Sequence, residues 1–178
     1  NSYLKADELA YIVQNSESQV LITSRSRREV AMEAAAMCPR LKLCLIVDGT
    51  GDDGNFLDYA TEVAKFPSTP IEDESLGVSM MYSSGTTGRP KGILRPLQDS
   101  APDTPLPLWG FLDGLWKYRD GMRYLSPAPL YHSAPQAAVG LTLRRGGTVI
   151  IMEHFDPEDY LRLVEKYKVT HSQLVPTM

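Results

Sequence analysis

Residues 82–92 read Tyr82-Ser83-Ser84-Gly85-Thr86-Thr87-Gly88-Arg89-Pro90-Lys91-Gly92 and follow a strand-like segment over 77–83. Glycines allow positive φ angles and let backbone N–H groups approach an oxyanion, and the serine and threonine hydroxyls add further donors. Lys91 supplies a mobile positive charge. This combination predicts a loop that binds a polyphosphate.

Two other interpretations of the loop have to be weighed. A Walker A loop needs a lysine directly after its second glycine and then a serine or threonine. Here Arg89 follows Gly88, Gly92 follows Lys91, and Pro90 would break a helix opening at this point, so the sequence excludes a P-loop NTPase. A plain polar hairpin between two strands stays open, because serine, threonine and glycine are common turn residues.

The segments on both sides of the loop alternate between helix and strand patterns. Strands separated by helices of about 10 to 15 residues are typical of βαβ crossovers. We therefore predict an α/β fold with a largely parallel sheet flanked by helices. The predicted strands are 19–23, 41–47, 77–83, 93–95, 122–126, 148–152 and 171–175, and the predicted helices are about 6–13, 26–37, 56–64, 108–118, 135–144 and 156–167.

Two of these helices have specific start signals. Ser26 and Glu29 have the spacing of a capping box. Asp156 precedes Pro157 and two more acidic residues, which is typical of a helix N-terminus. The buried face of this second helix is expected to consist of Tyr160, Leu163, Val164 and Tyr167.

Composition and charge exclude several classes of protein. With 178 residues, 43% apolar content and 22% charged residues, the chain can bury a sizeable core. The net charge of −4 comes without a long block of one sign, so a nucleic-acid partner is not indicated. No apolar run approaches the roughly 20 residues that span a bilayer, and the start lacks a signal peptide. We expect a soluble cytoplasmic protein without an integral membrane segment.

Beyond composition, two motifs resemble those of one known family. Residues 83–92 resemble the phosphate-loop signature of the adenylate-forming (AMP-binding) superfamily, which includes acyl-CoA synthetases, aryl-CoA ligases, luciferases and peptide-synthetase adenylation domains. The stretch Leu125-Ser126-Pro127-Ala128-Pro129-Leu130-Tyr131-His132-Ser133-Ala134 is similar to the family's next motif, in which a Pro-rich turn presents an aromatic or His pair to the acyl pocket. The resemblance covers essentially the whole chain but only part of a family member.

The resemblance implies an internal fragment of the N-terminal domain of an ATP-dependent, AMP-forming acyl-CoA synthetase, a ligase of fatty-acid metabolism. Such an enzyme activates a carboxylic acid, expected here to be a fatty acid, with ATP and Mg²⁺ and then transfers the acyl group to coenzyme A. The implied ATP-binding residues are Ser83, Ser84, Gly85, Thr86, Thr87, Gly88 and Lys91, with catalytic roles for Lys91 and Thr86 and substrate-binding roles for Tyr131 and His132. No metal ligand is assigned.

We expect residues 1–178 to form a single partial AMP-binding domain, with the phosphate loop at 82–92 and the acyl-pocket motif at 125–134. The family's later Tyr-Gly-x-Thr-Glu and Ser/Thr-Gly-Asp motifs and its C-terminal lysine have no counterpart in this sequence. The chain alone is therefore expected to be inactive. Missing neighbouring elements would uncover apolar faces, which predicts self-association.

The acid that the family member activates is constrained by one position. Adenylation domains for amino acids usually carry an Asp directly after the pocket aromatic, because a buried ammonium needs a carboxylate partner. Here His132 follows Tyr131, which favours a simple carboxylic acid. The alternatives are an aryl-CoA ligase, an amino-acid adenylation domain and a non-catalytic nucleotide-binding module, and Leu94-Arg95-Pro96, where many members have Thr-His, leaves the subfamily open. His154 and His171 lack metal-ligand spacing and are expected to be structural.

Overall fold

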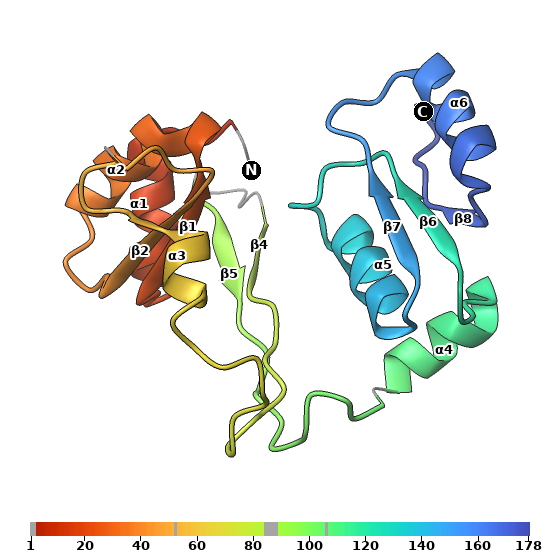
Figure 1. Ribbon diagram of the computed structural model, residues 1–178, viewed down its shortest axis with the longest axis horizontal. Coiled ribbons are helices and arrows are strands. Elements are labelled where there is room, and N and C mark those ends of the chain that lie inside the picture. The colour runs from red at the N-terminus through yellow and green to blue at the C-terminus, as the bar shows by residue number, and fades with distance from the viewer. Residues whose placement is uncertain (1–2, 52, 84–88, 106) are drawn as a thin grey trace. The chain divides into compact units, whose positions relative to one another are not determined.

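A computed structural model describes residues 3–51, 53–83, 89–105 and 107–178. The chain divides into two compact units, Asn1–Pro102 and Asp103–Met178. Each unit contains a three-stranded parallel sheet with helices packed on it (Figure 1). The predicted α/β class is therefore confirmed, whereas the assignment of residues 1–178 to one partial domain stays a prediction.

The described residues of unit 1 form two sheets. In the first, with strand order β1-β2-β3, neighbouring strands are parallel, and the second is the antiparallel pair β4-β5. The elements in chain order are α1 (Ala6–Asn15), β1 (Val20–Ser24), the 3-10 turn η1 (Arg25–Arg27), α2 (Arg28–Ala36), β2 (Leu43–Val47), β3 (Leu57–Asp58), α3 (Tyr59–Val63), β4 (Met81–Ser83) and β5 (Lys91–Ile93).

Two apolar clusters hold the helices of unit 1 to its parallel sheet. One lies between α1 and α2 and consists of Ala10, Val13, Ala34 and Cys38. The other joins α2 to the sheet through Ala31, Ile46 and Phe56. Ile46 is fully buried in β2, the middle strand of this sheet, and the neighbouring Leu45 is buried as well.

Unit 2 places its middle strand between two parallel neighbours, in the order β7-β6-β8. Helix α5 packs on β6 and β7 through a core of Met122, Tyr124 and Ala138. Gly147 permits this packing, since a Cβ there would lie 2.9 Å from the Met122 carbonyl oxygen. The elements are α4 (Pro107–Trp116), β6 (Arg123–Ser126), α5 (Ser133–Arg144), β7 (Thr148–Ile151), α6 (Pro157–Tyr167) and β8 (His171–Ser172).

The two predicted helix starts had different outcomes. Asp156 caps α6 as expected, because its Oδ1 accepts a hydrogen bond from the Asp159 backbone N–H at 2.8 Å. The capping box at Ser26 is wrong: α2 begins at Arg28, after the turn η1, and the Ser26 hydroxyl lies 3.0 Å from that of Ser24 instead. The expected apolar face of α6 is only half-buried, and its Tyr167 is exposed.

Strand lengths also differ from the predictions. The strand expected over 77–83 begins only at Met81, and the one expected over 171–175 ends at Ser172. The strand expected over 93–95 lies at Lys91–Ile93, because it pairs with β4 across the loop. Strand β3 was not expected, since a two-residue strand has no periodicity to detect.

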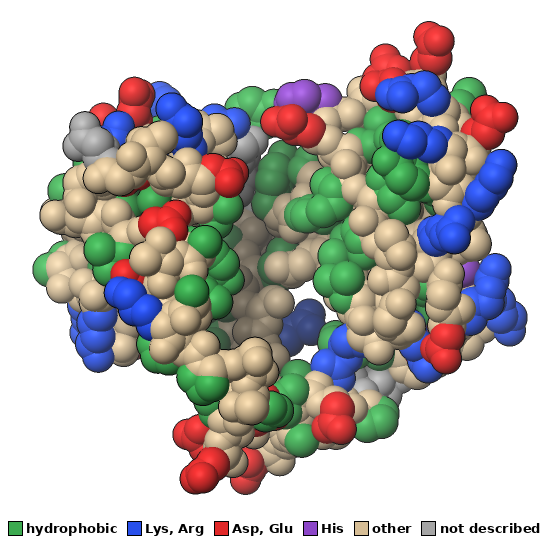
Figure 2. All heavy atoms as spheres, in the orientation of Figure 1, with side chains coloured by type: hydrophobic (Ala, Val, Ile, Leu, Met, Phe, Trp, Pro, Cys, Tyr) green, Lys and Arg blue, Asp and Glu red, His purple; other side chains and the backbone are tan. Residues whose placement is uncertain are grey.

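Large apolar side chains lie exposed on both units, and hydrophobic atoms are visible at the surface in Figure 2. Examples are Ile22 on β1, Ile151 on β7 and Leu161 on α6, which are 53%, 55% and 67% exposed. Exposed apolar surface of this kind is a common cause of association. These residues support the predicted self-association, which stays a prediction.

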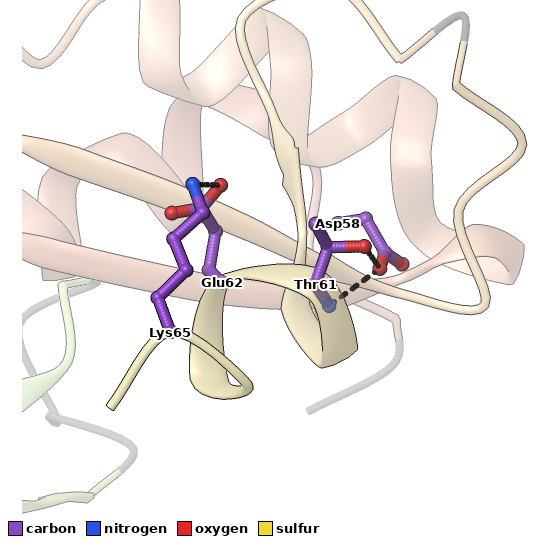
Figure 3. A network of polar contacts seen from close by, with 4 residues as sticks. All are labelled: Asp58, Thr61, Glu62 and Lys65. Carbon is purple, nitrogen blue, oxygen red and sulfur yellow. Dashed lines mark hydrogen bonds and ion pairs between the residues drawn. The ribbon is translucent and has the colours of Figure 1, made fainter. Parts of the chain in front are cut away.

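Helix α3 begins at a capping aspartate that gives a pH-dependent prediction. The Asp58 carboxylate accepts hydrogen bonds from the Thr61 hydroxyl at 2.6 Å and from the Thr61 backbone N–H at 2.8 Å (Figure 3). These two bonds hold the pKa of Asp58 below its usual range. The cap therefore stabilises the fold above the carboxyl's unfolded pKa, and this contribution disappears as the pH falls through the lower, folded pKa.

We expect Asp58→Ala to lower the melting temperature at neutral pH, because the cap is lost. The gap between this variant and the wild type should close as the pH is lowered through the folded pKa of Asp58. Asp58→Asn is the matched control, since asparagine also caps helices without ionising. Thermal unfolding followed by circular dichroism from pH 7 downward measures this, and a gap that stays constant with pH would refute the ionic part of the interpretation.

Candidate functional site

The two ends of the loop that is predicted to bind a polyphosphate are brought together by an antiparallel hairpin. In the β4-β5 ladder Ser83 pairs with Lys91, Tyr82 with Gly92 and Met81 with Ile93. Ser83 and Lys91 are therefore cross-strand neighbours at the open end of the ladder. The β4-β5 pair is compatible with a polyphosphate-binding loop and with a plain polar hairpin, so it does not decide between them.

Five predicted loop residues lie outside the described residues: Ser84, Gly85, Thr86, Thr87 and Gly88. Ser83 and Lys91, which flank them, are both exposed. Within the described part of the chain, no carboxylate lies within 4.0 Å of the Lys91 ammonium. An exposed ammonium without a carboxylate partner can bind a phosphate oxygen without first breaking an ion pair.

The acyl-pocket motif lies at the carboxyl end of β6, the middle strand of the parallel sheet in unit 2. The chain stays buried through Ala128 and then turns outward. Tyr131 and His132 are exposed, with ring centroids 4.6 Å apart and planes tilted by 50°. His132 is the N-cap residue of α5, and its backbone N–H donates to the Pro129 carbonyl oxygen at 3.2 Å. The motif thus occupies the edge at which parallel α/β sheets usually bind ligands.

Unit 2 also contains an apolar cavity of about 500 Å³, which the sequence analysis missed. One wall is a stripe of α5 formed by Ala134, Ala137, Ala138 and Leu141. The remaining lining residues belong to α4 and β8 or lie directly beside one of these elements in the chain. They are Leu112, Trp116, Tyr118, Thr170, His171, Ser172, Gln173 and Leu174. The helical spacing of the three alanines was the available signal, because small side chains on one face leave room beside a helix.

His171 lies in the wall of this cavity with both ring nitrogens engaged. Its Nε2 is 3.1 Å from the Trp116 carbonyl oxygen, and its Nδ1 is 2.8 Å from the Thr170 hydroxyl. Because a carbonyl only accepts, Nε2 must carry the proton. The ring of Tyr118 packs edge-on against the imidazole, with centroids 5.1 Å apart. These contacts fix the orientation of His171, in agreement with the structural role expected for it.

The described residues contain no group of three or more His, Cys, Asp or Glu side chains that could hold a metal ion. In the part of the chain that the structure describes, no helix is both long enough and apolar enough to cross a bilayer.

Comparison with known proteins identifies the family. The model of the family described as AMP-binding enzyme matches residues 1–178, and the chain therefore belongs to this family. The medium/long-chain-fatty-acid–CoA ligase FadD8 of Mycobacterium tuberculosis is 32% identical over 126 residues, which are 68% of this chain and 21% of that protein. The 2-succinylbenzoate–CoA ligase of Bacillus licheniformis is 30% identical over 183 residues, covering 100% of this chain and 34% of that protein.

Solved structures agree on the fold. A protein from Rhodopseudomonas palustris described as a putative long-chain-fatty-acid CoA ligase superposes with a TM-score of 0.76 at 22% identity, over 99% of this chain and 43% of that one. The N-terminal domain of FACL13 from Mycobacterium tuberculosis gives a TM-score of 0.75 at 23% identity, over 99% of this chain and 42% of that one. ATP-bound MatB from Rhodopseudomonas palustris gives 0.66 at 25% identity, over 99% and 33%.

The chain spans about a third or less of the length of these curated relatives, 34% of one and 21% of the other. The family expected from the two sequence motifs and the fold class expected from the alternating helices and strands are confirmed. The curated relatives are named as ligases that join an acid to CoA, and the acids differ among them.

Proposed function

We propose that this chain is the phosphate-loop portion of an ATP-dependent, AMP-forming acyl-CoA synthetase. The single observation that carries the proposal is the hairpin that sets Ser83 beside Lys91, in a chain of the AMP-binding enzyme family. The proposed co-substrates are ATP, accompanied by Mg²⁺, and coenzyme A. The cytoplasmic location stays a prediction.

The proposed reaction has two steps. In the first, a carboxylate oxygen of the acid attacks the α-phosphorus of ATP, and the bond to the β-phosphate oxygen breaks to release pyrophosphate. In the second, the thiol of coenzyme A attacks the acyl carbonyl of the adenylate, loses its proton and displaces AMP. The first step depends on holding and neutralising the leaving pyrophosphate.

The chain's own residues have proposed roles in the first step. Lys91 places its ammonium on the β- and γ-phosphate oxygens, and the Ser83 hydroxyl donates to the same group from the opposite strand. The same role is proposed for residues 84–88, with Thr86 as a further hydroxyl donor close to the reacting phosphates.

A fatty acid is the proposed substrate. The apolar cavity of about 500 Å³ in unit 2 is of a size that holds a small-molecule ligand. It adjoins the acyl-pocket motif, since His132 is the residue before the first turn of α5 and Ala134 in that turn lines the cavity. Aryl acids are the second candidate, because relatives are named as 2-succinylbenzoate–CoA and benzoate–CoA ligases.

A substrate panel tests the assignment. The full-length protein that contains this chain is incubated with ATP, Mg²⁺ and coenzyme A, and with medium and long fatty acids, cinnamates or amino acids in parallel. Mass spectrometry of the CoA thioesters should find fatty acyl-CoA as the main product. A preference for aryl acids would keep the mechanism and change the substrate, whereas adenylation of amino acids alone would contradict the interpretation of His132.

A further inference from the structure

Both arms of the phosphate-loop hairpin contact the same face of helix α1. The Tyr11 hydroxyl donates to the Pro90 carbonyl oxygen at 3.1 Å, on the arm that enters β5. The Tyr82 hydroxyl lies 2.7 Å from Asn15 Oδ1, on the arm that leaves β4. Tyr11 and Asn15 are four residues apart in α1, so they lie one above the other on one face of that helix.

Each arm of the hairpin makes a second interaction with α1. The guanidinium of Arg89 lies over the Tyr11 ring, 5.2 Å from its centroid, which adds a cation–π interaction next to the Pro90 hydrogen bond. The Tyr82 hydroxyl is also 3.4 Å from the Ile12 carbonyl oxygen. Burial raises the pKa of the Tyr82 hydroxyl, so it stays protonated and able to donate at physiological pH.

Gly92 makes room for the Tyr82 ring. The two residues are paired across the β4-β5 ladder, and a Cβ at position 92 would lie 3.0 Å from Cζ of Tyr82 and 3.1 Å from its hydroxyl oxygen. The same Cβ would lie closer still to Cε of Met80, so that side chain would have to move, and the Tyr82 ring would have to shift by a few tenths of an ångström. The glycine that ends the loop signature thus has a packing role of its own.

We infer that Tyr11, Asn15 and Tyr82 are positioning residues that fix Ser83 and Lys91 for phosphate binding. Pro90 directly precedes Lys91 and Tyr82 directly precedes Ser83, so each held residue is one peptide away from a proposed phosphate-binding side chain. Small displacements of such donors weaken stabilisation of a developing charge. Helix α1 is therefore an external support for the loop, and this inference rests on the proposed function.

Conservative variants of the full-length protein test the inference. Tyr11→Phe keeps the ring beneath Arg89 and removes only the hydroxyl, and Tyr82→Phe removes the bond to Asn15. Each is expected to raise the KM for ATP about 2- to 10-fold, the range for losing one hydrogen bond, with the KM for the acid unchanged. Tyr59→Phe, on the exposed α3, is the matched control and should change neither constant.

Double variants distinguish two separate supports from one shared contact. Tyr82→Phe combined with Asn15→Ala should raise the KM for ATP no further than Tyr82→Phe alone, because the tyrosine variant already removes the bond to Asn15 together with the longer contact to the Ile12 carbonyl oxygen. Tyr82→Phe combined with Tyr11→Phe should multiply the two single effects, because the bonds hold different arms. Amide hydrogen exchange over residues 81–83 and 91–93 without nucleotide should be faster in both hydroxyl-deletion variants and unchanged in Tyr59→Phe.

Different results would contradict the positioning role and the proposed function. If the wild-type protein is active and both single variants keep their KM for ATP within twofold, the positioning role is wrong and the proposed function stands. If both constants change together, or only the amount of folded protein falls, the residues are structural and the inference is overturned. If the wild-type protein shows no acid-dependent turnover of ATP, the proposed function fails and the inference fails with it.

Discussion

Lys91→Ala in the full-length enzyme is expected to lower the rate of acid-dependent exchange of pyrophosphate into ATP about 5- to 150-fold. The figure corresponds to a charge-assisted contact of about 1 to 3 kcal/mol in a partly closed site. Lys91 is exposed at the end of the β4-β5 ladder, directly across from Ser83. Its removal should therefore change phosphate binding and leave the hydrogen bonds between the strands intact. Thr86→Val should act in the same direction.

Lys65→Ala is the matched control for this variant. Its ammonium lies 2.6 Å from Oε1 of Glu62, three residues earlier, and forms a surface ion pair (Figure 3). Both residues precede the β4-β5 hairpin in the sequence. Surface pairs of this kind contribute little to stability, and Lys65 lies outside the loop at 82–92. Equal exchange rates in Lys91→Ala, Lys65→Ala and the wild type would mean that residues 82–92 form only a turn.

Ile46→Ala is expected to reduce the free energy of unfolding by about 2 to 5 kcal/mol, the range for truncating a fully buried isoleucine. Ile46 has no exposed surface, lies on the middle strand β2 and packs against Ala31 and Phe56. The alanine would leave a cavity between the sheet and α2, which neighbouring side chains fill only in part. Urea unfolding of the 178-residue chain, followed by circular dichroism, measures the change.

Ile22→Ala provides the matched comparison. Ile22 lies on β1, the strand next to β2, but 53% of its surface is exposed. Less than about 1 kcal/mol should be lost, because little apolar area leaves the core and the strand preference of isoleucine is modest. If both variants lost a similar free energy of unfolding, Ile22 would have to be packed as tightly as Ile46, which its exposed surface contradicts.

Local signals in the sequence predicted the parts of the fold that depend on neighbouring residues. The cap of α6 at Asp156 is an example, because capping joins a side chain to a backbone N–H three residues later. The Ser26 prediction rested on the same spacing and was wrong, because the turn η1 places the start of α2 at Arg28. A capping pattern shows that a helix can begin at a residue, and the preceding turn decides whether it does.

The candidate site was predictable only in part for a different reason. The loop signature is continuous in sequence, so residues 82–92 could be recognised without knowing the fold. The support from α1 joins residues far apart in the chain, 79 positions for Tyr11 and Pro90 and 67 for Asn15 and Tyr82. The cavity in unit 2 likewise joins α4, α5 and β8. The support from α1 has no periodic pattern, and the only signal for the cavity is the spacing of three alanines on α5, because both features arise from tertiary packing.

The most direct test of the central claim is exchange of labelled pyrophosphate into ATP by the full-length protein, measured with and without a carboxylic acid. Because formation of the acyl adenylate is reversible, label should enter ATP only when a suitable acid is present, without coenzyme A. Exchange that depends on a fatty acid and falls in Lys91→Ala is the predicted result. Absence of exchange with every acid of the panel, from a folded protein that binds ATP, would contradict the claim and favour a nucleotide-binding module without ligase activity.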